Sequence, residues 1–193
     1  MGVGAIGSFF TQTLAKMGAK TITVSDPDTL EEHNISNQGY PMHYIGREKV
    51  AALGEIINND VGLPLFKFAE EWGWRRADFL VVCPDKMDVR IFAFNEWRRK
   101  AKKGSYFLDA RMGAELLRCY CVPFTPEAIK KYQDTLYTSA DAVKAPCTAK
   151  SIIYTPLLAA AFLLNFIKKI GSKEKPPFEI IHDFVTGIHQ ENR

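Results

Sequence analysis

Three glycines near the start of the chain are spaced in a way that can hold a phosphate. Gly2, Gly4 and Gly7 stand in the order G-x-G-x-x-G within the stretch MGVGAIGS. Backbone N–H groups approach an anion closely where no Cβ intervenes, and a helix N-terminus favours negative charge. Taken alone, this pattern favours a dinucleotide, because dinucleotide-binding proteins are its commonest users.

A carboxylate follows at a distance that suits a nucleotide. The β-branched stretch KTITVSD ends at Asp26, about twenty residues after the glycines. A carboxylate in that place can accept hydrogen bonds from both hydroxyls of a ribose, which fits NAD and ATP equally. Asp26 could instead do no more than start the turn before Pro27.

More polar side chains with a use in phosphate chemistry follow along the chain. Asp28, Asn34 and Gln38 lie in SDPDTLEEHNISNQ, Lys49 lies in IGREKV, and Asp85 lies in VVCPDKMDVR. A lysine ammonium is a compact charge for a phosphate, and a carboxylate is a hard oxygen ligand for magnesium. This combination separates ATP from NAD, because an oxidoreductase has no shared use for these groups.

The same segments carry a resemblance to a known family. Four segments resemble, in order and in gaps, the motifs of the ThiF/MoeB/HesA adenylating enzymes, which are relatives of the ubiquitin-activating enzymes. The segments are G-V-G-A-I-G-S, D-P-D-T-L-E-E-H-N-I-S-N-Q, I-G-R-E-K and P-D-K. The resemblance is good from Gly2 to about Arg111 and continues more loosely through the last long apolar stretch.

The resemblance implies an ATP-dependent reaction that uses Mg²⁺. A substrate carboxylate, usually the C-terminal glycine of a ubiquitin-like or sulfur-carrier protein, attacks the α-phosphate of ATP, and pyrophosphate leaves. Lys49 and Asp85 are then the catalytic residues, with Asp85 as the magnesium ligand. The nucleotide contacts implied in this way are Gly2, Gly4, Gly7, Asp26, Asp28, Asn34, Gln38 and Lys49.

Three departures from the family pattern are visible. Asn37 stands where the family usually has an arginine, so a guanidinium for the phosphates is lost or comes from elsewhere, with Arg47 and Arg111 as candidates. The T-D-N signature is replaced by P-D-K at residues 84–86. The C-x-x-C pairs that hold zinc in many members are missing, so we expect no structural zinc.

One of the four cysteines is a candidate for covalent chemistry. Cys147, in APCTAKSIIYTPLLAAA, lies where the family often has a catalytic cysteine, and a thiol near a helix N-terminus has a lowered pKa. We therefore include Cys147 among the catalytic candidates, with an inert cysteine as the alternative. Cys83, Cys119 and Cys121 lie in apolar stretches and are predicted to pack in the core.

Alternating strands and helices must position these residues. Strands are predicted at 20–26, 63–68, 77–85, 105–113 and 114–124, the last antiparallel at an edge, with helices at 8–19, 47–60, 87–102, from 126, and from 147 or 148. This order indicates an α/β, Rossmann-like, doubly wound and mostly parallel sheet with helices on both faces. Its ligand crevice lies beyond the carboxyl ends of the strands, so Asp26, Asp85 and Asp109 are predicted to share one rim.

The family pattern also includes an apolar strand before the glycines, and only Met1 precedes Gly2 here. We therefore expect the first strand to be missing from the chain as printed. Without it, we expect residues 1–193 to form a single adenylation domain of reduced stability, with a nucleotide-binding core at 1–111 and edge strands, a crossover loop and the long apolar helix at 112–193.

Composition excludes some classes of protein. The net charge is only +3, which does not favour nucleic acid as the main partner. The apolar run 152–167 contains a proline and falls short of the ~20 apolar residues of a membrane span, so no membrane is expected. The cysteine spacings fit no disulfide framework, which suggests the cytoplasm, and the resemblance implies a homodimer.

Two other functions stay open at this point. One is a nucleotide-binding partner that has lost turnover, as the inactive half of an adenylating heterodimer, which the change at Asn37 favours. The other is an NAD-dependent oxidoreductase, which accounts for the glycines and Asp26 alone.

Overall fold

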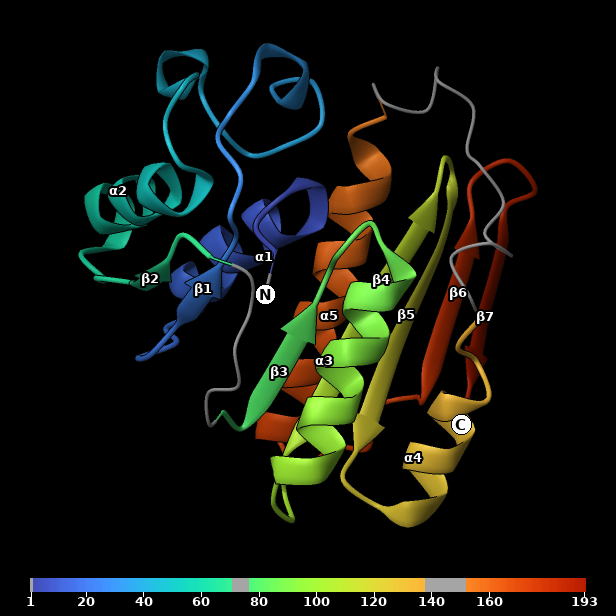
Figure 1. The fold of residues 1–193 in the computed structure, drawn as a ribbon. Coiled ribbons are helices and arrows are strands. Elements are labelled where there is room, and N and C mark those ends of the chain that lie inside the picture. The colour runs from blue at the N-terminus through green and yellow to red at the C-terminus, as the bar shows by residue number, and fades with distance from the viewer. Residues whose placement is uncertain (1, 71–76, 138–151) are drawn as a thin grey trace.

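A computed structural model describes residues 2–70, 77–137 and 152–193 of the chain. Helices and strands alternate along the first two thirds, and the chain then ends in a long helix and a hairpin (Figure 1). The helices are α1 (Ala5–Lys16), η1 (Glu32–Asn34), η2 (Met42–Tyr44), α2 (Lys49–Val61), α3 (Met87–Lys100), α4 (Pro126–Gln133) and α5 (Tyr154–Gly171). The strands are β1 (Thr23–Ser25), β2 (Phe66–Phe68), β3 (Phe79–Val82), β4 (Tyr106–Gly113), β5 (Leu116–Pro123), β6 (Glu179–Asp183) and β7 (Ile188–Asn192).

The strands form two sheets. β1 pairs with β2 in parallel, and the other five strands follow the order β3-β4-β5-β6-β7. β3 and β4 are parallel, whereas the pairs β4–β5, β5–β6 and β6–β7 are antiparallel. The predicted α/β, Rossmann-like class is therefore confirmed, with a larger antiparallel part than we expected. Among the described residues, no strand joins β1 and β3, so the two sheets are separate.

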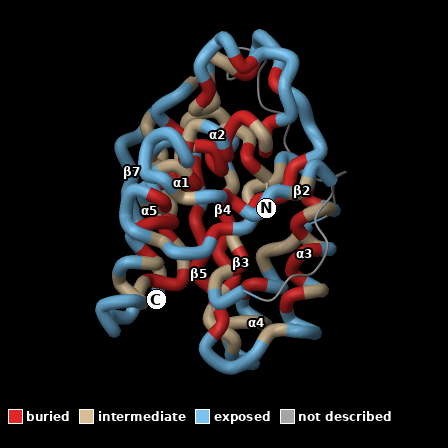
Figure 2. Tube along the Cα trace, turned by 90° about the vertical axis from the view of Figure 1, so that its left-hand side faces the viewer, coloured by how far each residue is buried: buried red, intermediate tan, exposed pale blue. Residues whose placement is uncertain are grey.

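Both faces of the larger sheet are covered, which explains why its strands read as nearly continuous apolar runs. In β4, Phe107 packs with α3 on one face, while its neighbour Leu108 packs with α1 and α5 on the other. β5 alternates in the same way, because successive side chains of a strand point to opposite faces. Figure 2 shows the buried positions gathered along these central elements and the exposed ones along the outer loops.

A separate apolar cluster holds the first part of the chain. Val24 of β1 and Leu53 of α2 are buried in it, together with Val3 beside the glycines. This cluster seats the glycine loop, which we define as residues 2–7, against the carboxyl end of β1. None of the described helices is long and apolar enough to cross a membrane.

Two predictions about elements need correction. β5 is antiparallel as expected, but it lies between β4 and β6, and the edge strands of the described sheet are β3 and β7. The long helix begins at Tyr154 and not near residue 147, because Pro156 suits the first turn of a helix, where its missing N–H has no intrahelical partner.

Candidate functional site

The glycine loop opens onto an uncapped helix. Gly4 is the N-cap of α1, no side chain caps it, and no acidic residue lies in the first turn. A Cβ added to Gly4 would meet no heavy atom within 4 Å, whereas one added to Gly7 would lie 1.9 Å from the Gly2 carbonyl oxygen. Gly7 therefore allows the loop to close on itself, and Gly4 leaves open space beside the free N–H groups. This is the geometry that an anion requires.

The glycine loop also joins the ends of two strands. The Gly2 N–H donates to the carbonyl oxygen of Ser25, the last residue of β1, at 2.9 Å. On its other side, a Cβ at Gly2 would lie 3.5 Å from the carbonyl oxygen of Cys83, just after β3. Asp85 follows two residues later and is exposed. The loop thus lies between the carboxyl ends of β1 and β3, where an α/β fold binds its ligands.

Asp26 holds the glycine loop in place. Its Oδ2 accepts a hydrogen bond from the Val3 N–H at 2.8 Å, and its Oδ1 accepts one from the Asp28 N–H at 3.0 Å. The residue is buried, with 7% of its surface exposed. Each carboxylate oxygen keeps a second lone pair, so Asp26 can order the loop and still accept from a ribose hydroxyl.

Lys49 and Asp28 form an uneven ion pair. The Lys49 Nζ lies 2.7 Å from Asp28 Oδ2, and the lysine side chain is 7% exposed while that of the aspartate is 62% exposed. The backbone N–H of Lys49 also donates to the Asp28 carbonyl. Through Asp28 and Asp26, the ammonium of Lys49 is connected to the glycine loop by an unbroken series of contacts.

Asn34 and Gln38 differ in their surroundings. The Asn34 Oδ1 accepts from the Glu31 N–H at 3.0 Å and so supports the turn η1. The Gln38 Oε1 is buried and has no hydrogen-bond partner among the described residues. A buried oxygen without a donor is costly, so this atom can accept a hydrogen bond or a metal ion that the described residues do not supply.

Asp109 does not belong to the rim, contrary to the prediction. It lies inside β4, fully buried, opposite the last residue of β3. Its carboxylate pairs with Arg90 at 2.6 Å and Arg111 at 2.7 Å, and it accepts from the Tyr132 hydroxyl at 2.9 Å. The reason is that β4 continues beyond the end of β3 to form a hairpin with β5. Of the three predicted carboxylates, Asp26 and Asp85 follow strand ends.

The two proposed substitutes for a guanidinium at position 37 are already engaged. Arg47 pairs with Glu55 at 2.8 Å. Arg111 pairs with Asp109 and donates to both oxygens of Thr135. The Asp109 carboxylate favours the charged form of Arg111 and raises the pKa of that guanidinium against the opposing effect of burial. Arg111 is thus fixed in the core, whereas the pair of Arg47 with Glu55 is half exposed on both sides.

The cysteines that the structure describes are core residues, as predicted. Cys119 and Cys121 are buried, and burial raises the pKa of the Cys121 thiol to about 12. Cys83 is partly buried, and burial likewise raises the pKa of its thiol to about 12. These thiols are poor nucleophiles near neutral pH. Cys147 lies outside the described residues, so its role stays a prediction.

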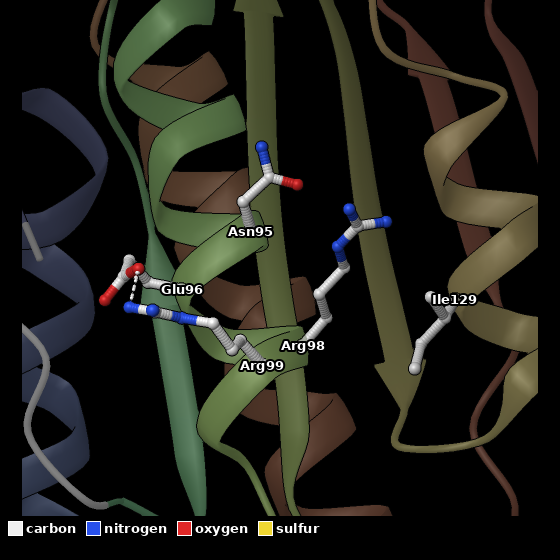
Figure 3. Close-up of a pocket in the computed structure, with 5 residues that line it drawn as sticks. All are labelled: Asn95, Glu96, Arg98, Arg99 and Ile129. Atoms are coloured by element: carbon white, nitrogen blue, oxygen red, sulfur yellow. Dashed lines mark hydrogen bonds and ion pairs between the residues drawn. The ribbon is translucent and has the colours of Figure 1, made fainter.

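A surface pocket of about 500 Å³ lies elsewhere, between α3 and α4 (Figure 3). Charged residues of α3 line it together with Ile129 of α4, and two of them, Glu96 and Arg99, pair with each other. These positions follow the start of α3 by more than two turns, roughly 12 Å along the helix axis. The pocket is therefore separate from the glycine loop.

Comparison with known proteins found one family model and several similar solved structures. The model of the ThiF family matches residues 1–183. No curated protein matches the chain. Among solved structures, E. coli MccB with ATP is similar with a TM-score of 0.78 and 16% identity, over all of this chain and 62% of that one. PaaA, in its selenomethionine form, has a TM-score of 0.77 and 15% identity, again over all of this chain and 62% of the other.

A further MccB structure, with MccA-N7isoASN, is similar with a TM-score of 0.75 and 15% identity, over all of this chain and 63% of that one. The chain thus spans less than two thirds of the length of these structural relatives. At such low identity, they show the shared fold. The family model covers nearly the whole chain, including the glycine loop and its surroundings. The chain belongs to the ThiF family.

Proposed function

We propose that this chain transfers AMP from ATP to a carboxylate, the C-terminus of a small protein or peptide. The observation that carries the proposal is the uncapped start of α1 with open space at Gly4. It is connected to the Lys49 ammonium through Asp26 and Asp28. Such a site presents N–H donors and one cation to a triphosphate. The solved structures of E. coli MccB with ATP and of MccB with AMPCPP and MccA support the choice of substrates.

The chemistry would proceed in one displacement. A carboxylate oxygen of the substrate forms a bond to the α-phosphorus as the bond from that phosphorus to the bridging oxygen of the β-phosphate breaks. The acyl-adenylate and pyrophosphate are the products. Lys49 would stabilise the negative charge that builds on the α-phosphate, and the N–H groups at the start of α1 would orient the chain of phosphates.

The residues present also suit a magnesium ion. Asp85 offers an exposed carboxylate directly after β3, and the buried Gln38 Oε1 has no partner among the described residues. Both atoms are hard oxygen donors, which Mg²⁺ prefers. When bound, the ion would neutralise charge on the phosphates. We propose Asp85 as its ligand from the protein.

The first test is isothermal titration calorimetry of the full-length protein, with MgATP and, in a separate experiment, with NADH. We expect MgATP to bind and NADH not to bind. Pyrophosphate exchange into ATP should then appear when a small protein with a C-terminal glycine, encoded beside this gene, is added. Binding of NADH without MgATP would instead favour an oxidoreductase.

Comparison of two exposed aspartates tests whether Asp85 acts as a metal ligand or only through its negative charge. Asp85→Asn should raise the Mg²⁺ concentration needed for half-maximal ATP binding, because it removes the proposed ligand. Asp88→Asn is the matched control, since Asp88 is also exposed and lies three residues further along, in the first turn of α3. Equal effects of the two substitutions would contradict the assignment of Asp85.

A nucleotide-binding partner without turnover is the second candidate. It is favoured by Asn37 and by the engagement of Arg47 and Arg111 in other ion pairs. This candidate predicts MgATP binding with no pyrophosphate exchange from any of the carriers supplied. A substitution of Asn37→Arg that creates exchange would then identify the missing guanidinium as the reason.

A further inference from the structure

A tyrosine two residues after Gln38 reaches back to the glycine loop. The Tyr40 hydroxyl donates to the Val3 carbonyl oxygen at 2.7 Å, and the Asp26 carboxylate accepts from the Val3 N–H at 2.8 Å. Both backbone polar groups of Val3, which stands between Gly2 and Gly4, are thus held by side chains from outside the loop. We propose that Tyr40 is a positioning residue that keeps the glycine loop in its phosphate-binding shape. This inference rests on the proposed nucleotide site.

The neighbours of Tyr40 fasten the same segment to α1. The Gly39 N–H donates to Ser8 Oγ at 2.9 Å, and Gln12 Nε2 donates to the Gly39 carbonyl oxygen at 2.6 Å. The fit is close, because a Cβ at Gly39 would lie 2.7 Å from Gln12 Nε2. The segment that carries Gln38 is therefore fastened to α1 by these contacts and to the glycine loop by Tyr40.

The contact is well protected. Tyr40 is 4% exposed and Val3 is 1% exposed, so water cannot easily replace either partner. Burial and the nearby Asp26 carboxylate both raise the pKa of the Tyr40 hydroxyl, so it stays a donor at neutral pH. Loss of this donor would leave the Val3 carbonyl oxygen buried without its partner, beside residues that need a fixed shape.

A second tyrosine offers a matched comparison. Tyr44 is also 4% exposed and packs in the same apolar cluster. Its hydroxyl donates to Glu55 Oε1 at 3.2 Å, away from the glycine loop. Removing either hydroxyl takes away one hydrogen bond from a buried tyrosine, but only Tyr40 bonds to the glycine loop, whereas the acceptor of Tyr44 is the half-exposed carboxylate of Glu55.

The test uses Tyr40→Phe and Tyr44→Phe in the full-length protein. Hydrogen–deuterium exchange of residues 2–8, without nucleotide, reports on the loop, and calorimetric titration with MgATP reports on binding. We expect Tyr40→Phe to speed exchange about tenfold and to weaken MgATP binding about tenfold, with neither change in Tyr44→Phe. No change in Tyr40→Phe, or equal changes in both variants, would overturn the proposal.

The two measurements also separate this inference from the proposed function. If the wild-type protein binds no MgATP, the proposed function fails, and exchange in residues 2–8 still decides whether Tyr40 holds the loop. Gln12→Met is a milder variant in case Tyr40→Phe does not fold, because the side chain is half-buried and keeps its length. It should speed exchange in residues 2–8 and 38–40 by a smaller factor, and unchanged exchange there would count against the proposal.

Discussion

Two buried cations in this protein have opposite surroundings. Lys49 makes its ion pair with an aspartate that is largely exposed. Arg90 pairs with the fully buried Asp109 and also donates to the carbonyl oxygens of Pro84 and Ala110. The first cation has a partner that water or a ligand can reach, whereas the second is completely occupied inside the core.

The difference distinguishes the proposed ligand site from a part of the scaffold. Around the glycine loop, the helix start is uncapped and the Gln38 Oε1 is left without a donor among the described residues. Around Asp109, two guanidinium groups and the Tyr132 hydroxyl satisfy the carboxylate. A buried ion pair with complete hydrogen bonding supports the fold, whereas a buried oxygen without a donor can still accept one from a bound molecule.

The largest expected effect is on the Asp109 network. Asp109→Asn leaves Arg90 and Arg111 without their buried counter-charge, which should lower the free energy of unfolding by about 3–5 kcal/mol. Urea denaturation measures this directly. Asp134→Asn, which breaks an exposed pair with Lys130, should cause no measurable change. Equal stability of the two variants would show that the network is not structural.

Lys49→Met should lower activity strongly and stability little, the opposite of Asp109→Asn. Pyrophosphate exchange should fall by about 10²–10³-fold, because the cation at the α-phosphate is lost. Melting should shift only slightly, since the exposed Asp28 carboxylate is readily hydrated. Lys16→Met, which breaks the exposed pair with Asp60, is the control for a lost surface lysine. A loss of stability as large as that of Asp109→Asn would make Lys49 a structural residue.

The smallest effect concerns the Cys121 thiol between pH 8 and pH 10. Burial raises its pKa to about 12, above the value near 9 of the unfolded chain, so the unfolded state releases this proton first as pH rises. Below about pH 9 the thiol has no effect on the pH dependence, and above it stability falls by up to about 1.4 kcal/mol per pH unit. The effect ends near pH 12.

Cys121→Ala should therefore flatten the loss of stability between pH 8 and pH 10. Urea denaturation of both proteins at the two values provides the measurement. The difference in the free energy of unfolding between the two proteins should be smaller at pH 10 than at pH 8, by about 1 kcal/mol. A constant difference would mean that the thiol titrates normally in the folded protein.

Local patterns were enough to predict much of the fold. The helix α2 follows from its apolar periodicity, and β3 follows from a short apolar run before a proline. The position of Asp26 at the end of β1 follows from the spacing after the glycines. Pro156 was a usable signal for the start of α5, because proline is tolerated in the first turn of a helix.

Contacts between distant residues were not available to such patterns. Tyr40 bonds to Val3 across 37 positions, and nothing in the sequence marks that tyrosine as different from Tyr44. The burial of Asp109 depends on the hairpin of β4 with β5 and on Arg90 from a preceding helix. The end of β1 before Asp26 was predictable. The length of β4, which places Asp109 inside the strand and not beyond it, depends on tertiary pairing.

The contact of Gly2 with both strand ends has a mechanical consequence. Within the part of the chain that the structure describes, backbone hydrogen bonds do not join β1 to β3, and Gly2 bonds Ser25 while lying against Cys83. A molecule bound to these few atoms would link the sheet of β1 and β2 to the sheet that begins with β3. Its affinity would then appear as resistance of the whole chain to unfolding and to proteases, growing with the logarithm of its concentration.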